Sequence, residues 1–413
     1  MSATETTRPE ESLRLGGADA VRAAARVTSA LLARGAAAGD REGAFPFDGI
    51  DAIWSSGLGN LTLPAALGGV GADLECAAEA ISILAEGDPS AALVLVMHLA
   101  HIPLLALPGS GCPPRLRALF VESTLSGPAL ANALRVEPEL GTPARGGIPA
   151  TRATRVIGPG GDVEWSLTGR KIFSTGAPGL RWMLVWGATA DDDPDGVRIG
   201  WFVVPGDARG ISIEETWDHL GMRASASHDV LFDEVRIPLD HAFGLHAPGA
   251  APASGRDATT VGAMLVLLLS VYLGVASAAR DWLVGYLHER APANLGAPLA
   301  SLPRFQSAVG AIESQLTSSA RLIGGLARDL DAGGEPAARA GAEAPLVKTV
   351  VTADLIDAVS TAVSLVGNAG LTHRHPLQRH LRDVLCSRIH TPQEDAVLLA
   401  AGRAVLATST EGA

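Results

Sequence analysis

The chain has 413 residues, of which 47% are hydrophobic and 18% are charged, a charged share below the roughly 25% of an average soluble protein. This composition excludes a disordered tail protein and predicts large buried surfaces, and the length predicts two or three domains. The formal net charge of −12 and the lack of a long basic run argue against a general nucleic-acid binder.

The three cysteines, Cys76, Cys112 and Cys386, lie too far apart in the sequence to form a CxxC pair or a disulfide ladder. We therefore expect the reducing cytoplasm as the location of the chain. The first residues, Met1 to Leu13, are polar and lack the apolar core of a signal peptide, which agrees with that expectation.

Helical patterns come first in chain order, and a β pattern follows. Residues 18–123 are rich in Ala and Leu at helical spacing. Residues 125–245 contain short β-branched and aromatic runs separated by turn residues, which predicts an antiparallel barrel or sandwich. Its expected strands are Thr151–Ile157, Val163–Leu167, Trp182–Ala188, Arg198–Val204 and Asp229–Ile237.

The last region, residues 256–406, returns to long apolar helices, with breaks expected at Pro292–Pro303, Ala332–Pro345 and Gly367–Pro376. Within it, Ala258–Ala279 carries no charge in 22 residues and is long enough to span a bilayer. No aromatic belt or basic flank marks its ends, so we expect a buried bundle helix and no membrane. Ala332–Ala344 has low complexity and predicts an exposed loop.

Several motifs of known chemistry are missing from the sequence. It contains no GxxxxGK[ST], no HExxH, no GxSxG and no GxGxxG that opens a βαβ unit. P-loop chemistry, α/β-hydrolase chemistry and a metal site therefore have no support in the sequence. The order of helices, β region and helices also excludes a doubly wound nucleotide-binding fold.

A series of family-like motifs runs through the chain in a fixed order. They are Leu63–Ala72 (LPAALGGVGA) with Glu86–Ser90, Gly169–Gly176 (GRKIFSTG), Leu220–Ser227 with Phe232–Pro238, Gly367–Gly370, and Arg379–Asp383 (RHLRD). With these motifs the sequence resembles the acyl-CoA dehydrogenase superfamily of flavoproteins, from about residue 40 to 408. Each motif alone is weak, but their common order is a specific signal.

The resemblance implies an α+β multidomain fold and an assembly. We expect an N-terminal helical domain over residues 15–124, a middle β-barrel domain over 125–250 and a C-terminal four-helix bundle over 255–408. Members of the family often form homotetramers as dimers of dimers, and the low charge and long apolar helices of this chain agree with that.

The resemblance also implies a flavin cofactor, FAD or FMN. Phe173, Ser174 and Thr175 match the strand that lies behind the flavin ring, and without the resemblance Phe173 would be interpreted as a core residue. The turn from Gly367 to Gly370 lets backbone amides approach phosphates or an adenine. Arg290 and Gln306 fall where the family contacts the dinucleotide part, often across a dimer interface, and the guanidinium of Arg290 suits a pyrophosphate.

The sequence departs from the dehydrogenase pattern at the catalytic base, which must be a carboxylate near the ring. Aligned on Arg382-Asp383, the position of the usual Glu holds Thr391, and the alternative position on the first long bundle helix falls near Met264. Glu394 and Asp395 lie about one helical turn beyond Thr391. The TEPGxGSD loop of the family is degraded over Val136–Thr142.

Two histidines stand near these positions, His390 beside Thr391 and His98 at the end of an apolar helix run. The pair resembles the two active-site histidines of the monooxygenase branch, such as the dibenzothiophene monooxygenases. That branch takes reduced flavin from a separate flavin reductase, reacts it with O2 through a C4a-hydroperoxide, and transfers one oxygen atom to a small molecule. His101 competes with His98 on the same helix face, and a core role is the plainer interpretation of either.

Three functions follow from these observations. The first is a flavin-dependent monooxygenase with His390 and His98 as catalytic residues, acting on a small aromatic, sulfur or nitrogen compound or on a biosynthetic intermediate. The second is an acyl-CoA or acyl-carrier dehydrogenase that uses Glu394 or Asp395 as a displaced base. The third, of another class, is a non-catalytic homologue that binds flavin or acyl-CoA. No metal is expected in any of them.

Overall fold

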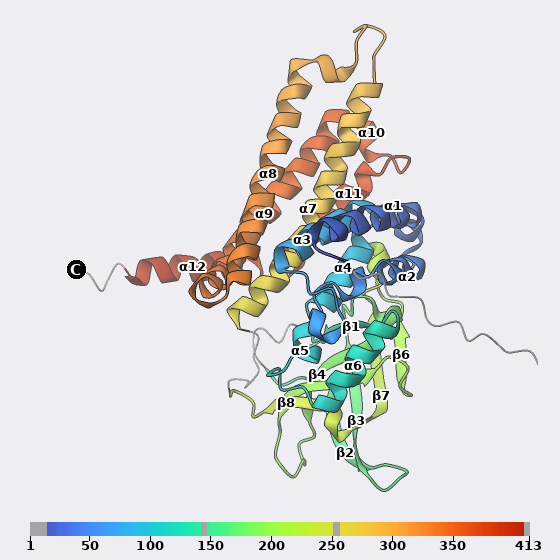
Figure 1. Cartoon of the computed structure of the whole chain (residues 1–413), viewed down its shortest axis with the longest axis vertical. Coiled ribbons are helices and arrows are strands. Elements are labelled where there is room, and N and C mark those ends of the chain that lie inside the picture. The colour runs from blue at the N-terminus through green and yellow to red at the C-terminus, as the bar shows by residue number, and fades with distance from the viewer. Residues whose placement is uncertain (1–14, 142–146, 251–256, 409–413) are drawn as a thin grey trace, which may run out of the picture.

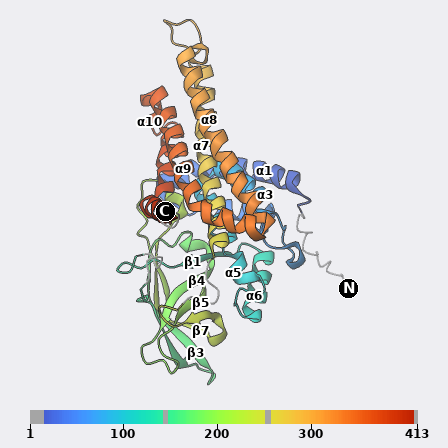
Figure 2. The same cartoon turned by 90° about the vertical axis from the view of Figure 1, so that its left-hand side faces the viewer.

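The computed structural model describes residues 15–141, 147–250 and 257–408. Two helical regions enclose a β region in chain order, and the long C-terminal helices extend away from the sheet (Figure 1; Figure 2). This arrangement confirms the predicted α+β architecture. The N-terminal helices are α1 (Ala18–Glu42), α2 (Phe47–Ser55), α3 (Leu74–Gly87), α4 (Pro89–Leu99), α5 (Ile102–Ala106) and α6 (Pro114–Ser126).

Aspartate side chains fix where three of the helices begin. Asp73 accepts a hydrogen bond from the Cys76 amide at 2.8 Å at the start of α3, and Asp88 accepts from the Ser90 and Ala91 amides at the start of α4. Asp257 does the same for Thr260 at the start of α7. Each carboxylate satisfies an amide that the helix leaves without a partner, which places these helix ends in the sequence.

The β region forms an eight-stranded sheet with the order β6-β7-β3-β2-β4-β5-β8, in which β1 also pairs with β4. Its strands are β1 (Leu130–Leu134), β2 (Arg152–Ile157), β3 (Val163–Lys171), β4 (Leu180–Thr189), β5 (Ile199–Pro205), β6 (Ile211–Glu214), β7 (Asp229–Pro238) and β8 (Ala242–His246). The five predicted strands are all present. The sheet is not purely antiparallel, because β4 runs parallel to both β1 and β2. The hairpin of β2 and β3 lies between β1 and β4 in the chain and provides the crossover that parallel pairing needs.

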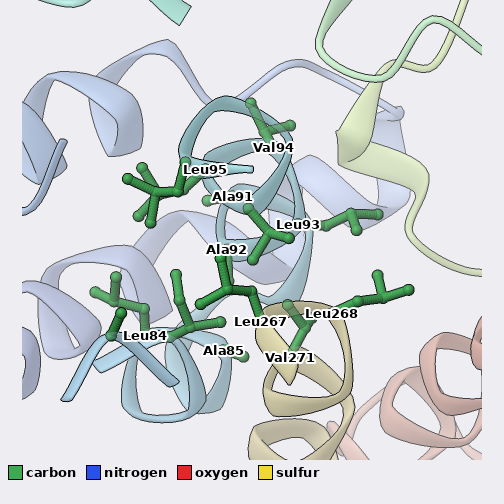
Figure 3. Packing of buried hydrophobic residues seen from close by; sticks show 14 of the residues in the cluster. Leu84, Ala85, Ala91, Ala92, Leu93, Val94, Leu95, Leu267, Leu268 and Val271 are labelled. Carbon is green, nitrogen blue, oxygen red and sulfur yellow. The ribbon is translucent and has the colours of Figure 1, made fainter. Parts of the chain in front are cut away.

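The C-terminal region is a bundle around one long apolar helix. Its elements are α7 (Ala258–Glu289), α8 (Pro303–Ala332), α9 (Gly334–Val366), α10 (Asn368–Leu371), α11 (Leu377–Leu385) and α12 (Glu394–Thr408). Helix α7 packs against α3, α4, α8, α9 and α11. In the core, Ala92 and Leu93 of α4 lie beside Leu267 and Leu268 of α7 (Figure 3).

The predicted loop at Ala332–Ala344 is wrong. Only Gly333 separates α8 from α9, and α9 begins at Gly334. Alanine has the highest helix propensity, so the low complexity of this stretch hid a helix. Its small residues also have a packing role, because a Cβ on Gly341 would lie 2.6 Å from the Ala258 carbonyl carbon of α7. The two helices therefore cross at close range.

Three helical stretches are long and apolar enough to cross a membrane by length and composition: Pro89–Ala106, Ala258–Glu289 and Gly334–Val366. In their most apolar windows, 78%, 67% and 44% of the residues are buried inside the protein. For α7 this agrees with the predicted bundle helix, because its apolar side chains face other helices of the same chain.

All three regions meet at one polar junction. The Arg382 guanidinium of α11 donates to both carboxylate oxygens of Asp40 in α1, at 2.8 and 2.5 Å, and to the Leu220 carbonyl at 2.8 Å. Arg223 donates to the Asp40 carbonyl at 2.7 Å. The Met222 amide donates to Asp383 at 2.7 Å, and burial raises the pKa of Asp383 to about 7. The loop after β6 is thereby fixed against both α1 and α11.

The close approach at Gly221 gives a test of this junction. A Cβ there would lie 2.3 Å from the Arg382 carbonyl oxygen, a distance that backbone atoms do not tolerate. Gly221→Ala should therefore lower the free energy of unfolding by about 1–3 kcal/mol, as overpacking does. Gly285→Ala on α7 is the matched control, since a Cβ at Gly285 meets nothing within 4 Å. Urea unfolding followed by tryptophan fluorescence measures the free energy of unfolding of both variants. Equal values for the two would contradict the close packing of Gly221 against Arg382.

Candidate active site

The turn that follows β3 presents an aromatic ring to solvent. Phe173 has a φ of +56° and its side chain is 53% exposed, so it is not a core residue. The Ser174 amide donates to the His228 carbonyl at 3.1 Å and the Gly176 amide to the Ser225 carbonyl at 2.8 Å, which holds the turn in place. A positive φ is uncommon for a bulky residue such as Phe, so the surrounding hydrogen bonds must hold the ring in this exposed position. The turn is therefore suited to receive a flat ligand.

Polar groups surround the next two residues of this turn. Ser227 donates to the Thr175 hydroxyl at 3.0 Å, and the Asn132 amide donates to the Thr175 carbonyl at 3.0 Å. The Ser174 hydroxyl is buried and has no hydrogen-bond partner among the described residues. A buried unsatisfied hydroxyl is costly without a ligand or water. Phe173, Ser174 and Thr175 thus combine an apolar face with free polar capacity, which fits a flavin ring and its polar edge.

The loop that corresponds to the TEPGxGSD motif, Val136–Thr142, takes part in a buried ion pair. Glu137 accepts from the fully buried Lys171 ammonium at 2.6 Å and from the Thr151 hydroxyl at 2.6 Å. The ion pair lowers the pKa of Glu137, although burial acts in the opposite direction. Thr142, the last residue of the degraded loop, lies outside the described residues. Glu137, the carboxylate that this loop shares with the TEPGxGSD motif, therefore anchors the loop to β3 through Lys171.

Arg290 and Gln306 lie together, but far from the Phe173 turn. Arg290 directly follows α7, and its backbone carbonyl accepts the Leu299 amide at 2.9 Å. The Gln306 side chain in the first turn of α8 donates to the Ala300 carbonyl at 3.0 Å. The connection between α7 and α8 lies at the tip of the bundle, at the end of the molecule opposite the sheet (Figure 1; Figure 2). One chain therefore does not bring these two groups of predicted flavin contacts to a single place.

Gly367 and Gly370 lie where α9 passes into α10. Gly367 has a φ of +59°, and a Cβ on Gly370 would lie 3.1 Å from the Val363 carbonyl oxygen. Both positions therefore favour glycine for reasons of backbone packing alone. Contact of this turn with a cofactor stays a prediction.

His390 is paired with a tyrosine that the sequence reasoning missed. Its Nε2 atom lies 2.6 Å from the hydroxyl of Tyr272, a fully buried residue of α7. Burial, with the positive charge of Lys348 on α9, lowers the pKa of His390 to about 4. The Lys348 ammonium itself donates to the Pro392 carbonyl at 3.0 Å. The imidazole is therefore neutral at neutral pH and held by a phenol, with its loop tied to α9.

His98 lies in the core of the N-terminal region. Its ring packs against Trp54 and Phe120, with centroid distances of 5.1 and 5.9 Å, and its Nδ1 accepts the Ala131 amide at 3.2 Å. Burial lowers its pKa to about 4. His98 and His390 make no hydrogen bond or ring contact with each other in the described part of the chain. The contacts of His98 are those of a core residue, and its catalytic role stays a prediction. Neighbouring His101 bonds the Met97 carbonyl at 2.5 Å.

The two positions of a dehydrogenase base carry no carboxylate. Met264 lines a cleft of about 330 Å³ between α4, α5, α7 and α8, and the one carboxylate on its lining, Asp331, accepts the Leu74 and Glu75 amides. Thr391 is exposed, as are Glu394 and Asp395 in the first turn of α12. Among the described residues, no group of three His, Cys, Asp or Glu side chains has the arrangement of a metal site.

A sequence signal for Tyr272 existed. The chain has only two tyrosines, and this one lies in the charge-free stretch of α7. A hydroxyl in such a helix needs a partner, but the sequence does not say which residue supplies it.

Three family models match the chain: the acyl-CoA dehydrogenase N-terminal domain over residues 18–110, the middle domain over 137–235 and the C-terminal domain over 266–394. Each match falls within one of the predicted domain ranges, while the predicted boundaries themselves stay predictions.

Similar proteins differ in their named activities. YdbM of Bacillus subtilis (strain 168), provisionally assigned as an acyl-CoA dehydrogenase, is 33% identical over 366 residues, or 88% of this chain and 90% of its own. L-evernosamine nitrososynthase of a Micromonospora species is 31% identical over 388 residues, which cover 89% of this chain and 85% of the nitrososynthase. The structure of KijD3 in complex with FMN and dTDP-3-amino-2,3,6-trideoxy-4-keto-3-methyl-D-glucose has a TM-score of 0.79 and 28% identity, covering 94% of each chain.

Proposed function

The chain belongs to the acyl-CoA dehydrogenase family, and from this premise we propose that it is a flavin-dependent monooxygenase. The observation that carries the proposal is the His390–Tyr272 pair, at 2.6 Å, beside the position where a dehydrogenase has its carboxylate base. The pair lacks the carboxylate that resembling dehydrogenases use to remove an α-proton, and the lowered pKa of His390 makes its imidazole a weaker base than a free histidine. They are well suited to donate and accept hydrogen bonds in a dry site.

The flavin would lie on the Phe173 ring, with Ser174 and Thr175 at its polar edge. When bound and reduced, the flavin supplies two electrons to O2, so that one oxygen atom passes to the substrate and the other leaves as water. Support for the cofactor comes from the exposed ring of Phe173 and the unsatisfied hydroxyl of Ser174. KijD3, a similar protein, has been solved with FMN.

The protein's own residues would position groups and exclude water. His390 stays neutral around pH 7 because burial and Lys348 lower its pKa, so it serves as a hydrogen-bonding group for the reacting atoms. The apolar residues Leu95 and Leu99 on α4 are buried and would help to exclude water around His98 on the same helix. His98 at the end of the same helix is the second proposed catalytic residue, with weaker support because its contacts are all with the core.

Two of the similar proteins, L-evernosamine nitrososynthase and KijD3, point to nitrogen as the substrate atom. A nitrososynthase converts an amine into a nitroso group, which requires oxygen on nitrogen, and KijD3 has been solved with an amino-deoxysugar nucleotide. We therefore propose an amine-bearing small molecule as the oxygen acceptor. Reduced flavin would come from a separate flavin reductase, because the described residues contain no motif or domain for a nicotinamide cofactor.

A second candidate is an acyl-CoA dehydrogenase, which the provisional assignment of YdbM favours. In that case Glu394 or Asp395 would act as the displaced base, although both are exposed in this structure. A non-catalytic flavin- or acyl-CoA-binding homologue is the third candidate, supported by the missing carboxylates and by the degraded loop over Val136–Thr142.

We further propose a homotetramer. Helix α12 carries exposed apolar residues that include Leu398, Leu399 and Leu406, and α9 exposes Val350. Such residues on a projecting helix favour association. The split between the Phe173 turn and the Arg290 connection also suits a flavin shared by two chains. Sedimentation velocity at micromolar concentration should give about four times the monomer mass, and a stable monomer would refute the assembly.

Replacement of Thr175 by valine tests the flavin site. The change is nearly isosteric and removes one hydroxyl that Ser227 contacts. The loss of one neutral hydrogen bond should weaken reduced-flavin binding roughly fivefold, measured by anaerobic fluorescence titration. Thr154→Val on the exposed side of β2 is the matched control and should leave the affinity unchanged. Unaltered affinity in the Thr175 variant would remove Thr175 from the site.

The ratio of oxygenated product to hydrogen peroxide tests the reaction class. His390→Ala should abolish product while reduced flavin still binds and O2 is still consumed, so that the oxygen appears as peroxide. His98→Ala should uncouple in the same direction and less strongly, and the exposed His288→Ala is the control. A dehydrogenase would instead lose α-proton exchange in Glu394→Gln or Asp395→Asn. A ratio of product to peroxide that stays at the wild-type value in both histidine variants would refute the proposed site.

A further inference from the structure

We propose that Tyr272 is a positioning residue that donates its phenol proton to Nε2 of His390 and so fixes the imidazole as the Nδ1–H tautomer. His390 then has one ring N–H to offer to a ligand, and it is on Nδ1. This inference rests on the proposed function for its catalytic meaning, but the tautomer itself is a property of the protein alone.

The direction of the hydrogen bond follows from the burial of Tyr272. Its side chain is fully buried, and His390 Nε2 is the one hydrogen-bond partner recorded for its hydroxyl among the described residues. If the imidazole donated from Nε2, the phenol proton would have no acceptor in the described surroundings. A buried unsatisfied donor is costly, so the phenol donates and Nε2 accepts.

The charged groups around the pair maintain this arrangement. Burial raises the pKa of Tyr272 well above 10, with Cys386 and Asp383 acting in the same direction, so the phenol keeps its proton. Burial and Lys348 lower the pKa of His390 to about 4, so the ring keeps a lone pair on one nitrogen. Lys348 on α9, Asp383 on α11 and Cys386 in the turn after it thus all favour the neutral phenol and the neutral imidazole.

The choice of tautomer decides what the site can do. With the proton on Nδ1, His390 can donate to an oxygen or nitrogen that gains negative charge during the reaction. With the proton on Nε2, the ring would donate to the tyrosine and offer a lone pair to the site instead. In the absence of a partner, a neutral histidine side chain favours the Nε2–H form, so the tyrosine is needed to reverse the preference.

Solid-state ¹⁵N NMR of protein labelled at histidine Nδ1 measures the tautomer directly. The His390→Gln variant assigns the His390 signal among the eleven histidines. At pH 7 the wild-type signal should have the shift of a protonated nitrogen, and in Tyr272→Phe it should move toward the unprotonated shift. Tyr286→Phe is the matched control, because Tyr286 is the other tyrosine of the chain, lies on the same helix and stacks on Trp282.

The ratio of oxygenated product to hydrogen peroxide provides a second, independent measurement. In Tyr272→Phe the ratio of product to peroxide should fall roughly fivefold, while the affinity for reduced flavin is unchanged. An unprotonated Nδ1 in the wild type overturns the inference even if Tyr272→Phe does not fold, and so does a Tyr272→Phe signal at the wild-type shift. If the tautomer is as proposed but the wild type forms no oxygenated product, the inference stands and the proposed function fails.

Discussion

The ion pair between Asp40 and Arg382 is the interaction on which the arrangement of the three regions depends. It joins α1 to α11, and through the Leu220 carbonyl and Arg223 it also holds the loop of the β region. A half-buried bidentate pair with further hydrogen bonds is geometrically specific, and removal of one partner leaves a buried charge. Since α11 leads directly to His390, this junction sets the position of the candidate site relative to the sheet.

Burial then determines the chemistry of that site. The Tyr272 phenol, the His390 imidazole and the Lys348 ammonium lie in a region with few opposing charges, so their pKa values shift in directions that favour neutral forms. A carboxylate in the same place would have been a base with a raised pKa. With threonine and histidine there instead, the groups present are ones that donate and accept hydrogen bonds, which is the basis of the proposed function.

The helices and strands were largely predictable because their signals are local. The β-branched runs predicted five strands, and the charge-free stretch predicted α7, since alternation and burial are both written along the chain. The Ala332–Ala344 stretch failed because composition alone does not distinguish a flexible loop from a helix of small residues. Small residues are necessary there because α9 crosses α7 closely at Gly341. The two contacting residues, Gly341 and Ala258, lie far apart in the sequence, so no local pattern shows the contact.

The sequence by itself determined the family and the fold, because both rest on motifs read in order along the chain, and it also showed that the two usual positions of the base hold no carboxylate. Only the tertiary structure decided which partners the chemical groups have. It joined His390 to Tyr272, 118 positions earlier, placed His98 against Trp54 and Phe120, and put the connection between α7 and α8 at the opposite end of the molecule from the sheet. Hydrogen bonds and burial depend on which segments pack together, and the packing is set by the whole chain rather than by any local pattern.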